Sequence, residues 1–422
     1  MIRVSVNDDI SAGSGLCARI PVASLSDLQA LIDRDLPASG DILVAVRPDP
    51  EGQLPRAAEQ FAAFMNFFLR AAGELSKELA AYNAGLAASD AQSHVAASQT
   101  EFVRMNAGGK CIRGALAKLG YHLFAGGTDS GYANGLALAF EIIQTSILIH
   151  DDIIDHATLR RNKTTIPCSY LSRWKAEERG LPGEEARDVA DSLALCAGDL
   201  GIFLSFRMLL RAYKEDPRLP VLADYFITAM LNTIKGEIID VALPFEEKHG
   251  LSREDSLYDS IIDISRLKTS WYTVTGPLCA GAIMAGCDGA SLKTLEEFGE
   301  NLGVAFQIKD DIMGIFSEEA PLGKNVGSDA AEFKQTLFYE YMRTREALYP
   351  KLLGYYGRKL TAQELAELQA LLKDCGALDY VESEMNRYFQ NAREILDRMD
   401  FLPEETKDLL YGLLIYLRYR KK

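Results

Sequence analysis

Three aspartates follow a long apolar run in the stretch ILIHDDIIDHATLRR. On a helix, Asp151 and Asp155 are four residues apart and project from one face, with Asp152 one step round. Carboxylates this close repel one another unless a cation joins them, and Mg²⁺ takes one or two carboxylates together with water and phosphate oxygens. By itself the D-D-x-x-D pattern fits a solvated helix end as well as a metal site.

A second acidic pair makes the metal site the better interpretation. The stretch FQIKDDIMGIF places Asp310 and Asp311 after another apolar helical run, where a helix would leave the core. Two such helices facing each other would form a deep cavity with a metal-binding mouth. We therefore expect magnesium at this mouth, where it would hold a polyanionic ligand.

Basic residues surround both acidic motifs. The stretch GGKCIRG sets Lys110 and Arg113 after two glycines, which permit close backbone approach, although the spacing is not that of a P-loop. Arg160 and Arg161 lie on the first acidic helix or just past it, where guanidinium groups can bind diphosphate oxygens in a bidentate way. Further candidates are Lys268, Lys324 and Lys334. Any one of these basic residues alone would be interpreted as a surface charge. The evidence for a binding site is their spacing around the two acidic motifs.

The elements that position these residues are predicted to be long helices. From about residue 57 onward, segments with helical periodicity follow one another, and Gly and Pro interrupt the connections. We predict helices over 57–83, 88–105, 111–125, 132–160, 187–213, 220–242, 255–285 and 290–316, and several more between 334 and 420. Gly276 and Pro277 should kink or unwind the helix that contains them. The main body is thus predicted to be all-α.

The composition of the chain limits the number of domains and the kinds of molecule that the protein can bind. The 422 residues are 48% hydrophobic and 25% charged, enough for one large core with additional material or for two domains. A net charge of −15 argues against a general affinity for nucleic acid or anionic membranes. Glu141 and Gln144 interrupt the most apolar long stretch, so we interpret it as a core helix and predict no transmembrane segment.

The N-terminal part differs from the rest. Residues 1–55 contain IRVSV and DILVAVRPD, two short β-like runs between polar and Gly/Pro segments. They fit a small appended element and a loosely packed arm equally well, so we predict an extension of unknown role over 1–55 and a helical domain over 56–422. Seven scattered cysteines without a C-x-x-C pair, and an N-terminus without a signal-peptide pattern, favour a cytoplasmic protein.

Five motifs together resemble a known family. GGKCIRG, QTSILIHDDIIDHATLRR, KTSWYTV, FQIKDDIMGIF and GKNVGSD with a following lysine have the order and separations of the trans-isoprenyl diphosphate synthases, the polyprenyl synthetase family. The resemblance runs from about residue 57 to the end. It implies an isoprenoid synthase-type bundle of long helices around a central cavity. It also implies a homodimeric prenyltransferase that condenses isopentenyl diphosphate with an allylic diphosphate by magnesium-assisted ionisation, condensation and elimination.

The resemblance gives each motif residue a role. The implied magnesium ligands are Asp151, Asp152, Asp155, Asp310 and Asp311. The implied contacts to the allylic diphosphate are Arg160, Lys268, Lys324 and Lys334. The implied isopentenyl diphosphate pocket consists of Lys110, Arg113, Gln144 and Arg161. The groups implied to flank the allylic cation are Thr269, Tyr272 and Gln307, which together with Lys268 form the expected catalytic set.

Two positions depart from the family pattern. Gly314 stands where many members carry a third aspartate of the second motif, although some active members also have glycine there. Cys111 replaces a frequent arginine. Because Asp310, Lys110 and Arg113 are all present, both binding sites should still work.

Product length should depend on the side chains one turn below Asp151, roughly 5 Å deeper in the cavity. These are Ser146 and Ile147, whereas short-chain members of the family usually carry bulky aromatic rings there. Without such rings the bottom of the cavity should lie deeper, which predicts a product longer than the fifteen-carbon farnesyl chain. We favour the twenty-carbon geranylgeranyl diphosphate, with longer polyprenyl diphosphates or farnesyl diphosphate as alternatives.

Three other interpretations compete with this one. A class I terpene cyclase shares an all-α fold and an Asp-rich first motif, but it would carry an N-S-E or D-T-E second motif and would not need GGKCIRG. A non-catalytic synthase subunit would tend to lose the aspartates, and this chain keeps five of them. A purely structural helical bundle leaves the ordered motifs unexplained.

Overall fold

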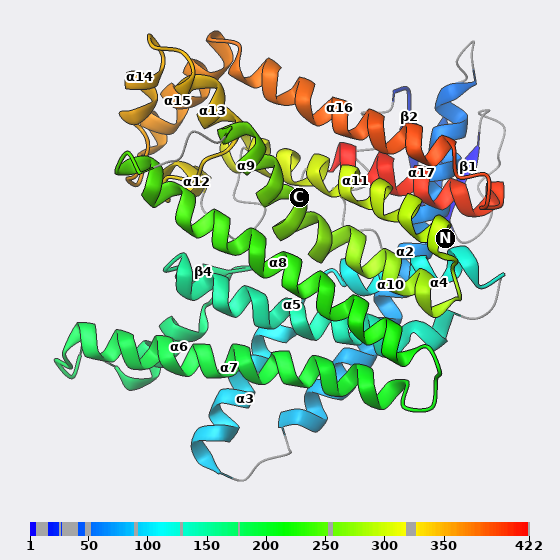
Figure 1. Cartoon of the computed structure of the whole chain (residues 1–422), viewed down its shortest axis with the longest axis horizontal. Helices are drawn as coiled ribbons and strands as arrows, with labels where there is room; N and C mark the ends of the chain where they lie inside the picture. The colour runs from blue at the N-terminus through cyan, green and yellow to red at the C-terminus, as the bar shows by residue number, and fades with distance from the viewer. Residues whose placement is uncertain are drawn as a thin grey trace.

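The protein is described by a computed structural model over residues 1–5, 16–24, 27, 41–46, 52–87, 92–126, 130–175, 178–251, 256–317 and 326–420. Its main body is a bundle of long helices, which confirms the predicted all-α body (Figure 1). The first half contains α2 (Gln53–Ala87), α3 (Ser93–Asn106), α4 (Ile112–Phe124), η1 (Ser130–Ala133), α5 (Asn134–Ile154), α6 (Ile166–Trp174), α7 (Gly183–Ala212) and α8 (Leu219–Lys248). The second half contains α9 (Leu257–Ile264), η2 (Ser265–Thr275), α10 (Gly276–Met284), α11 (Gly289–Phe316), α12 (Ser328–Ala331), α13 (Leu337–Arg343), α14 (Tyr349–Leu353), α15 (Ala362–Asp374), α16 (Ala377–Asp397) and α17 (Glu404–Tyr419).

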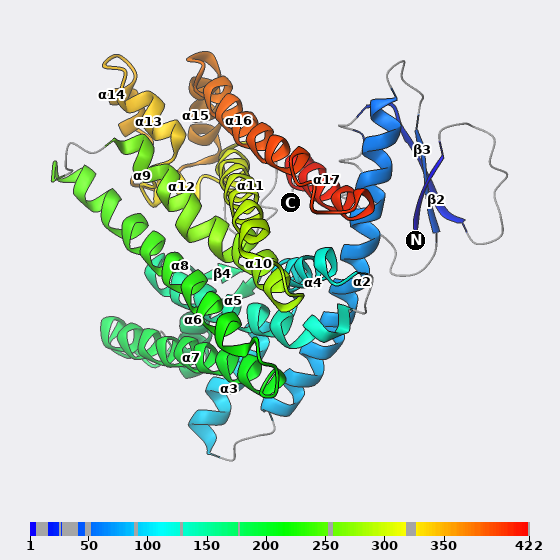
Figure 2. The same cartoon turned by 45° about the vertical axis from the view of Figure 1, so that its right-hand side comes forward.

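The centre of the bundle is formed by α5. Every residue from Leu136 to Ser146 is buried, and a helix that is apolar on all sides must be covered on all sides. In both views α7 lies along one side of α5 and α8 along the other (Figures 1 and 2). The remaining cover comes from α4, which in turn pairs with α10, while η2 and α16 pack on α11.

Two helical segments are long and apolar enough, by length and composition alone, to cross a membrane: Gly131–Ile154 and Gly183–Ala212. The apolar window of the first is 72% buried inside the bundle, as expected for a core helix. The window in the second, which is α7, is only 39% buried. Apolar side chains of α7 therefore remain uncovered in the single chain.

The helix predicted over 132–160 is shorter than expected. It ends at Ile154, because His156 has a φ of 50°, outside the right-handed helical region. The chain then forms an antiparallel ribbon of β4 (Leu159–Arg160) and β5 (Lys163–Thr164). Both residues between these strands have positive φ, as in a two-residue type I′ turn. The two arginines after the first motif are therefore on a hairpin.

The kink predicted at Gly276 and Pro277 takes the form of a π-helical segment. This segment is η2, which joins α9 to α10, and the N–H of Gly276 donates to the carbonyl of Trp271, five residues back. A Cβ at Gly276 would lie 2.3 Å from that carbonyl oxygen, so a larger residue would disturb the turn. Short π-helical turns are rare and often occur at functional sites.

A small parallel sheet precedes the helices. Its strands, in the order β1-β3-β2, are β1 (Ile2–Ser5), β2 (Leu16–Val22) and β3 (Asp41–Val46). The backbone of Ile2 forms two hydrogen bonds with the side-chain amide of Asn66 on α2, and Ile42 and Val44 belong to the same apolar core as α2. Figure 2 shows the sheet on the outer side of α2. The two predicted β-like runs are thus strands of a packed element.

Candidate active site

One cavity of about 600 Å³ brings most of the predicted site residues together. Its lining comes from the start of α4, from α5, the β4–β5 hairpin, α8, α9, η2, α11, α12 and the residues that follow α12, and from Arg420. The predicted residues that line it are Lys110, Arg113, Gln144, Ile147, Asp151, Arg160, Arg161, Lys268, Thr269, Tyr272, Gln307, Asp310, Asp311 and Lys334. Asp152, Asp155 and Ser146 lie outside this lining, and Lys324 lies outside the described residues.

The charge of the cavity differs from that of the whole chain. Within the described residues, seven Lys and Arg side chains and five Asp side chains line the cavity, although the chain carries a net charge of −15. A cleft with low-dielectric walls concentrates the field of such charges. The cavity therefore suits a polyanionic ligand in an otherwise acidic protein.

The first acidic motif is held by Arg160 of the hairpin. The Arg160 Nη2 lies 2.5 Å from Asp151 Oδ2, and its Nε donates to Asp152 Oδ1 at 2.7 Å. Burial alone would lower the pKa of Arg160, but Asp151 and Asp152 outweigh it and raise that pKa above its ordinary value. Asp152 is only 1% exposed, so Asp151 is the carboxylate of this pair that faces the cavity.

Three carboxylates surround the ammonium group of Lys268. Its Nζ lies 2.6 Å from Asp240 Oδ2, 2.7 Å from Glu237 Oε2 and 3.5 Å from Asp151 Oδ1. Burial alone would lower the pKa of Lys268, but Asp240 and Asp151 raise it above its ordinary value, and burial raises the pKa of Glu237. Gly236 allows η2 to approach α8 closely enough for these ion pairs. A Cβ at this position would lie 2.3 Å from the Lys268 backbone nitrogen.

The second acidic motif is joined to η2 through Gln307. The side chain of Gln307 accepts a hydrogen bond from Thr269 Oγ1 at 2.6 Å and donates to Asp311 Oδ1 at 2.7 Å. Asp310 accepts a hydrogen bond from Arg420, the last described residue of the chain. Arg420, which directly follows α17, therefore contributes a cation to the cavity.

The carboxyl groups of Asp310 and Asp311 both have raised pKa values. Burial is the main cause for Asp310, with Arg420 opposing it. Burial also raises the pKa of Asp311 well above its ordinary value, and the charge of Asp329 raises it further. Additional positive charge would stabilise the ionised form of both groups.

Asp329 of α12 lies beside Gly314, the position of the missing third aspartate of the second motif. A Cβ at Gly314 would lie 2.7 Å from Asp329 Oδ2, so this carboxylate takes the space that a side chain at position 314 would fill. Nearby, the Lys334 Nζ lies 3.2 Å from Glu332 Oε2 and 3.7 Å from Asp155 Oδ2. A third aspartate at position 314 would collide with a carboxylate that is already present.

A basic pocket forms around Gln144. In the amide orientation that satisfies its neighbours, Gln144 accepts hydrogen bonds from Arg161 Nη2 at 2.8 Å and Arg113 Nη1 at 2.9 Å, and donates to Glu141 Oε2 at 3.1 Å. The Arg113 guanidinium carbon lies 3.8 Å from the centre of the Tyr272 ring, which stacks the two groups. Buried Glu141 is one negative charge between two guanidinium groups, so the pocket keeps an excess of positive charge.

The backbone of Arg161 shows that this pocket is held against a cost. Its φ of 53° is left-handed, which costs of order 1–3 kcal/mol for a residue other than glycine. Burial and the neighbouring Arg113 lower the pKa of Arg161. An anionic ligand bound here would relieve the repulsion between the two arginines.

The donor set fits magnesium that shares a diphosphate ligand. No three His, Cys, Asp or Glu side chains among the described residues converge closely enough to hold a metal ion by themselves. Magnesium does not require such a cage, because it retains waters and binds through one or two carboxylates plus substrate phosphates. Asp151 on α5 and Asp310 on α11 supply hard oxygen atoms to the same cavity from different helices.

Five charged residues at the site were not predicted from the sequence. They are Glu141, Glu237, Asp240, Asp329 and Arg420. Asp329 lies inside the motif GKNVGSD, and Glu141 is one of the two polar interruptions of an apolar stretch, so both carried a signal. Nothing in the sequence distinguishes Arg420 from the other basic residues at its end.

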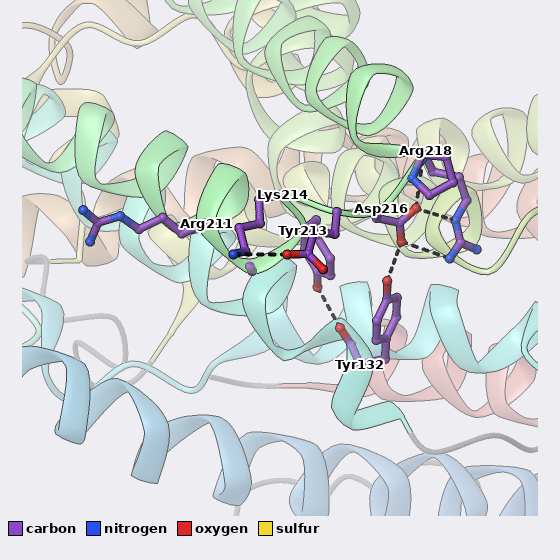
Figure 3. Close-up of a pocket in the computed structure, with 9 residues that line it drawn as sticks. Tyr132, Arg211, Tyr213, Lys214, Asp216 and Arg218 are labelled. Carbon is purple, nitrogen blue, oxygen red and sulfur yellow. Dashed lines mark hydrogen bonds and ion pairs between the residues drawn. The ribbon is translucent and has the colours of Figure 1, made fainter.

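A second hollow lies at the turn between α7 and α8 (Figure 3). Asp216 accepts hydrogen bonds from Tyr132 and Arg218, and Tyr213 donates to the Tyr132 carbonyl at 2.8 Å. The hydrogen bonds from Arg218 hold the pKa of Asp216 below its ordinary value. These polar groups satisfy one another, so we assign this hollow a structural role.

Comparisons with known proteins identify the family of the chain. Residues 98–372 match the family model described as Polyprenyl synthetase. The chain is 31% identical to a geranylfarnesyl diphosphate synthase of Aeropyrum pernix over 318 residues, which are 75% of this chain and 92% of the relative. It is 29% identical to a geranylgeranyl diphosphate synthase of Sulfolobus acidocaldarius over 322 residues, 74% of this chain and 88% of the relative. A crystal structure of geranylgeranyl pyrophosphate synthase from Corynebacterium glutamicum, complexed with isoprenyl diphosphate and magnesium, superimposes with a TM-score of 0.73 at 24% identity, covering 85% of this chain and 99% of that one.

The chain therefore belongs to the polyprenyl synthetase family. It is a prenyltransferase of the trans-prenyl diphosphate synthase class. The predicted isoprenoid synthase-type bundle is confirmed by the same comparison of folds.

Replacing Lys268 with methionine should destabilise the protein most at high pH. The substitution leaves Asp151, Glu237 and Asp240 without their shared ammonium, so the pKa of Glu237, which burial already raises, should rise further above that of the unfolded chain. The folded variant then binds more protons than the unfolded chain, and its stability falls as the pH rises through these pKa values. We expect a deficit of roughly 3 kcal/mol near pH 8 and a smaller one near pH 5, measured by chemical unfolding. Lys235→Met, at an exposed position of α8, is the control. Equal deficits for Lys268→Met at both pH values would contradict the charge arrangement.

Proposed function

We propose that this chain condenses isopentenyl diphosphate with an allylic diphosphate and that its main product is the twenty-carbon geranylgeranyl diphosphate. The observation that carries the proposal is one cavity with two sets of cations. Arg160, Lys268 and Lys334 stand among carboxylates, whereas Arg113 and Arg161 stand together around a single glutamine. The first set suits a diphosphate bound through magnesium, and the second suits a diphosphate gripped directly by guanidinium groups.

Magnesium belongs to the first set in this proposal. The residues proposed to hold it are Asp151, Asp152, Asp155, Asp310 and Asp311. When bound, it neutralises the departing diphosphate and makes it a better leaving group. The raised pKa values of Asp310 and Asp311 support this assignment, because those carboxyl groups lack a full complement of positive charge.

The cations of the chain act on the same allylic diphosphate. Arg160, Lys268 and Lys334 are already fixed by ion pairs at the acidic end of the cavity, and Lys324 completes the set predicted from the sequence. Side chains fixed before the reaction stabilise charge that develops on the departing oxygen without further reorganisation. Lys268 forms ion pairs with a carboxylate of α5, Asp151, and with a carboxylate of α8, Asp240.

The second diphosphate is held by Lys110, Arg113, Gln144 and Arg161. This arrangement leaves the double bond of isopentenyl diphosphate to attack C1 of the allylic cation. Tyr272 and the hydrogen-bonded pair of Thr269 and Gln307 also line the cavity, where their oxygen atoms can face that cation. Within the described lining there is no His or Glu, so the proton lost in the last step passes to the released diphosphate.

A second copy of the chain is proposed to cover the exposed apolar face of α8. Leu231, Ile234, Ile238, Val241 and Phe245 are all large, apolar and exposed. They repeat at alternating spacings of three and four, the pattern of a helix that packs against another helix. The uncovered apolar window of α7 adjoins the same side of the bundle (Figure 1). We therefore propose a homodimer in which these two helices form the interface.

The remaining proposals concern the ends of the chain and its location. Residues 56–422 form the prenyltransferase domain, and the element formed within 1–55 takes no part in the chemistry, since none of the described cavity residues comes from it. A cytoplasmic location remains the proposal for the compartment.

The purified chain should make a prenyl diphosphate from isopentenyl diphosphate, an allylic primer and magnesium, detected by product chromatography. A chelator should abolish the activity and added magnesium should restore it. Asp151→Asn should lower turnover by several orders of magnitude, because it removes one negative charge from the metal-binding set. Asp224→Asn, at an exposed position of α8, is the control. Full turnover of Asp151→Asn would refute the assignment.

The two diphosphate pockets should separate in the kinetics. Arg113→Ala should raise the KM for isopentenyl diphosphate roughly tenfold to a hundredfold, since a charged hydrogen bond contributes about 1.5–3 kcal/mol. Lys268→Met should instead act on the allylic substrate and on kcat. Initial rates with each substrate varied in turn measure both effects. If each variant affected the two substrates equally, the division into two pockets would be wrong.

The dimer should depend on the apolar stripe of α8. Glutamate at Ile234 and Ile238 together should convert the protein to monomers, because buried unpaired charge is costly at an apolar interface. Analytical ultracentrifugation at micromolar concentration measures the change, with Lys293→Glu, at an exposed position of α11, as a control on another helix. Wild-type protein that sediments as a monomer would remove this part of the proposal.

A further inference from the structure

The segment that carries Lys110 and Arg113 begins helix α4 without a cap of its own. The N-cap residue of α4 is Cys111, whose φ of 51° is left-handed and whose side chain forms no capping hydrogen bond. The first N–H groups of a helix have no partner within the helix, and an N-cap side chain usually accepts a hydrogen bond from the second or third of them. The start of α4 therefore needs an acceptor from another part of the chain.

That acceptor is Glu141 of α5. The backbone N–H of Gly114, the third residue of α4, donates to Glu141 Oε1 at 2.7 Å. A carboxylate at the N-terminus of a helix is also stabilised by the helix dipole. The two helices are in close contact at this point, since a Cβ at Gly114 would lie 3.0 Å from the carbonyl oxygen of Ala137. Glu141 thus fixes where α4 begins relative to α5.

The second oxygen of the same carboxylate fixes a side chain of the basic pocket. The amide nitrogen of Gln144, about one turn further along α5, donates to Glu141 Oε2 at 3.1 Å. The amide oxygen then accepts hydrogen bonds from Arg161 Nη2 at 2.8 Å and from Arg113 Nη1 at 2.9 Å. An amide turned the other way would direct its N–H groups at guanidinium groups, which can only donate. Glu141 therefore determines which end of the Gln144 amide faces the arginines.

Arg113 is also held from a third element, η2. Its Nη2 donates to Thr273 Oγ1 at 2.8 Å, and its guanidinium group stacks on the ring of Tyr272. A side chain that is fixed before the ligand arrives loses little conformational freedom on binding. The direction of Arg113 thus depends on its partners in α5 and η2 and on the place where α4 begins.

The charge and the position of Glu141 should act in opposite directions. Glu141 is 3% exposed and is not among the described residues that line the cavity, whereas Arg113, Gln144 and Arg161 do line it. Burial raises the pKa of Glu141, and the N–H of Gly114 and the charges of Arg113 and Arg161 oppose this rise. By charge alone, an ionised Glu141 would weaken the attraction of the two arginines for an anion. Its hydrogen bonds, by contrast, keep the pocket in one arrangement.

We propose that Glu141 is a positioning residue for the second diphosphate pocket, where it fixes the start of α4 and the direction of the Gln144 amide. In this way it holds Arg113 and Arg161 in place for the diphosphate group of isopentenyl diphosphate. The inference rests on the proposed assignment of that pocket. It predicts that removal of a negative charge weakens the binding of an anion, which is the reverse of what charge alone predicts.

The test compares two substitutions in the full chain. Glu141→Gln removes the charge and leaves one oxygen, so that either Gly114 or Gln144 loses its acceptor, whereas Glu141→Asp keeps the charge and shortens the side chain. Isothermal titration calorimetry measures the Kd of isopentenyl diphosphate, and initial rates give kcat and the KM of each substrate. Both variants should raise the Kd and the KM of isopentenyl diphosphate roughly tenfold or more, because hydrogen bonds of charged groups are lost. The KM of the allylic substrate and kcat should change far less.

Glu247→Gln is the matched control. The Glu247 side chain is 6% exposed and forms an ion pair with Arg343, away from the described cavity lining. This substitution also removes an enclosed carboxylate that is paired with an arginine. It should leave the Kd of isopentenyl diphosphate and both KM values unchanged.

The outcomes separate this inference from the proposed function. A wild type that forms no condensation product refutes the proposed function. If the wild type condenses, a folded Glu141→Gln that binds isopentenyl diphosphate as tightly as the wild type, or more tightly, overturns the positioning role. An equal loss for both substrates overturns it as well. Circular dichroism establishes that the variants are folded. If Glu141→Gln is not, Glu141→Asp decides, because an unchanged Kd in that variant would show that only the charge matters.

Discussion

The site depends on the pairing of four carboxylates at the acidic end of the cavity with cations from other parts of the chain. The pairs are Asp151 with Arg160, Asp240 with Lys268, Asp155 with Lys334 and Asp310 with Arg420. A buried carboxylate without such a partner would be costly, so these pairs fix the hairpin, the π-helical segment and the C-terminus relative to α5, α8 and α11. Three of these cations, Arg160, Lys268 and Lys334, are also proposed to bind diphosphate. Ligand entry would thus exchange one anionic partner for another and would not require new positive charge to be brought into the protein.

The parts of this arrangement that are local in sequence were predictable. The helices of the main body were predicted from helical periodicity and from the Gly and Pro residues in the connections. The first acidic motif was predicted from aspartates spaced one and four residues apart. The third strand was not predicted, because β2 contains Pro21 and lacks clear alternation, and such a strand is tolerated only at a sheet edge. The end of α5 was placed too late, because turn residues other than glycine hid the type I′ hairpin.

Other parts depend on contacts between distant segments, which one sequence does not reveal. Arg420 reaches Asp310 across 110 positions, and Asp329 of α12 meets Gly314 of α11 although they belong to different helices. Ser146 was expected below the cavity because it is one turn from Asp151. Its direction is decided by α7, whose glycines bring that helix so close that the serine is enclosed. The spacing along one helix predicts how far a residue lies below the acidic motif. The neighbouring helices decide whether that residue faces the cavity.

The last described helix connects the outer side of the bundle with the cavity. The last helix, α17, packs along α2, and Arg56 and Gln60 of α2 both donate hydrogen bonds to Asp408. From there the chain runs into the cavity wall, where the Arg420 guanidinium lies 3.9 Å from the centre of the Phe306 ring. The N-terminus, by contrast, begins in a strand on the outer side of α2 (Figure 2). A substitution that loosens α17 from the outer helix α2 would therefore also disturb the cavity wall, because Arg420 directly follows α17.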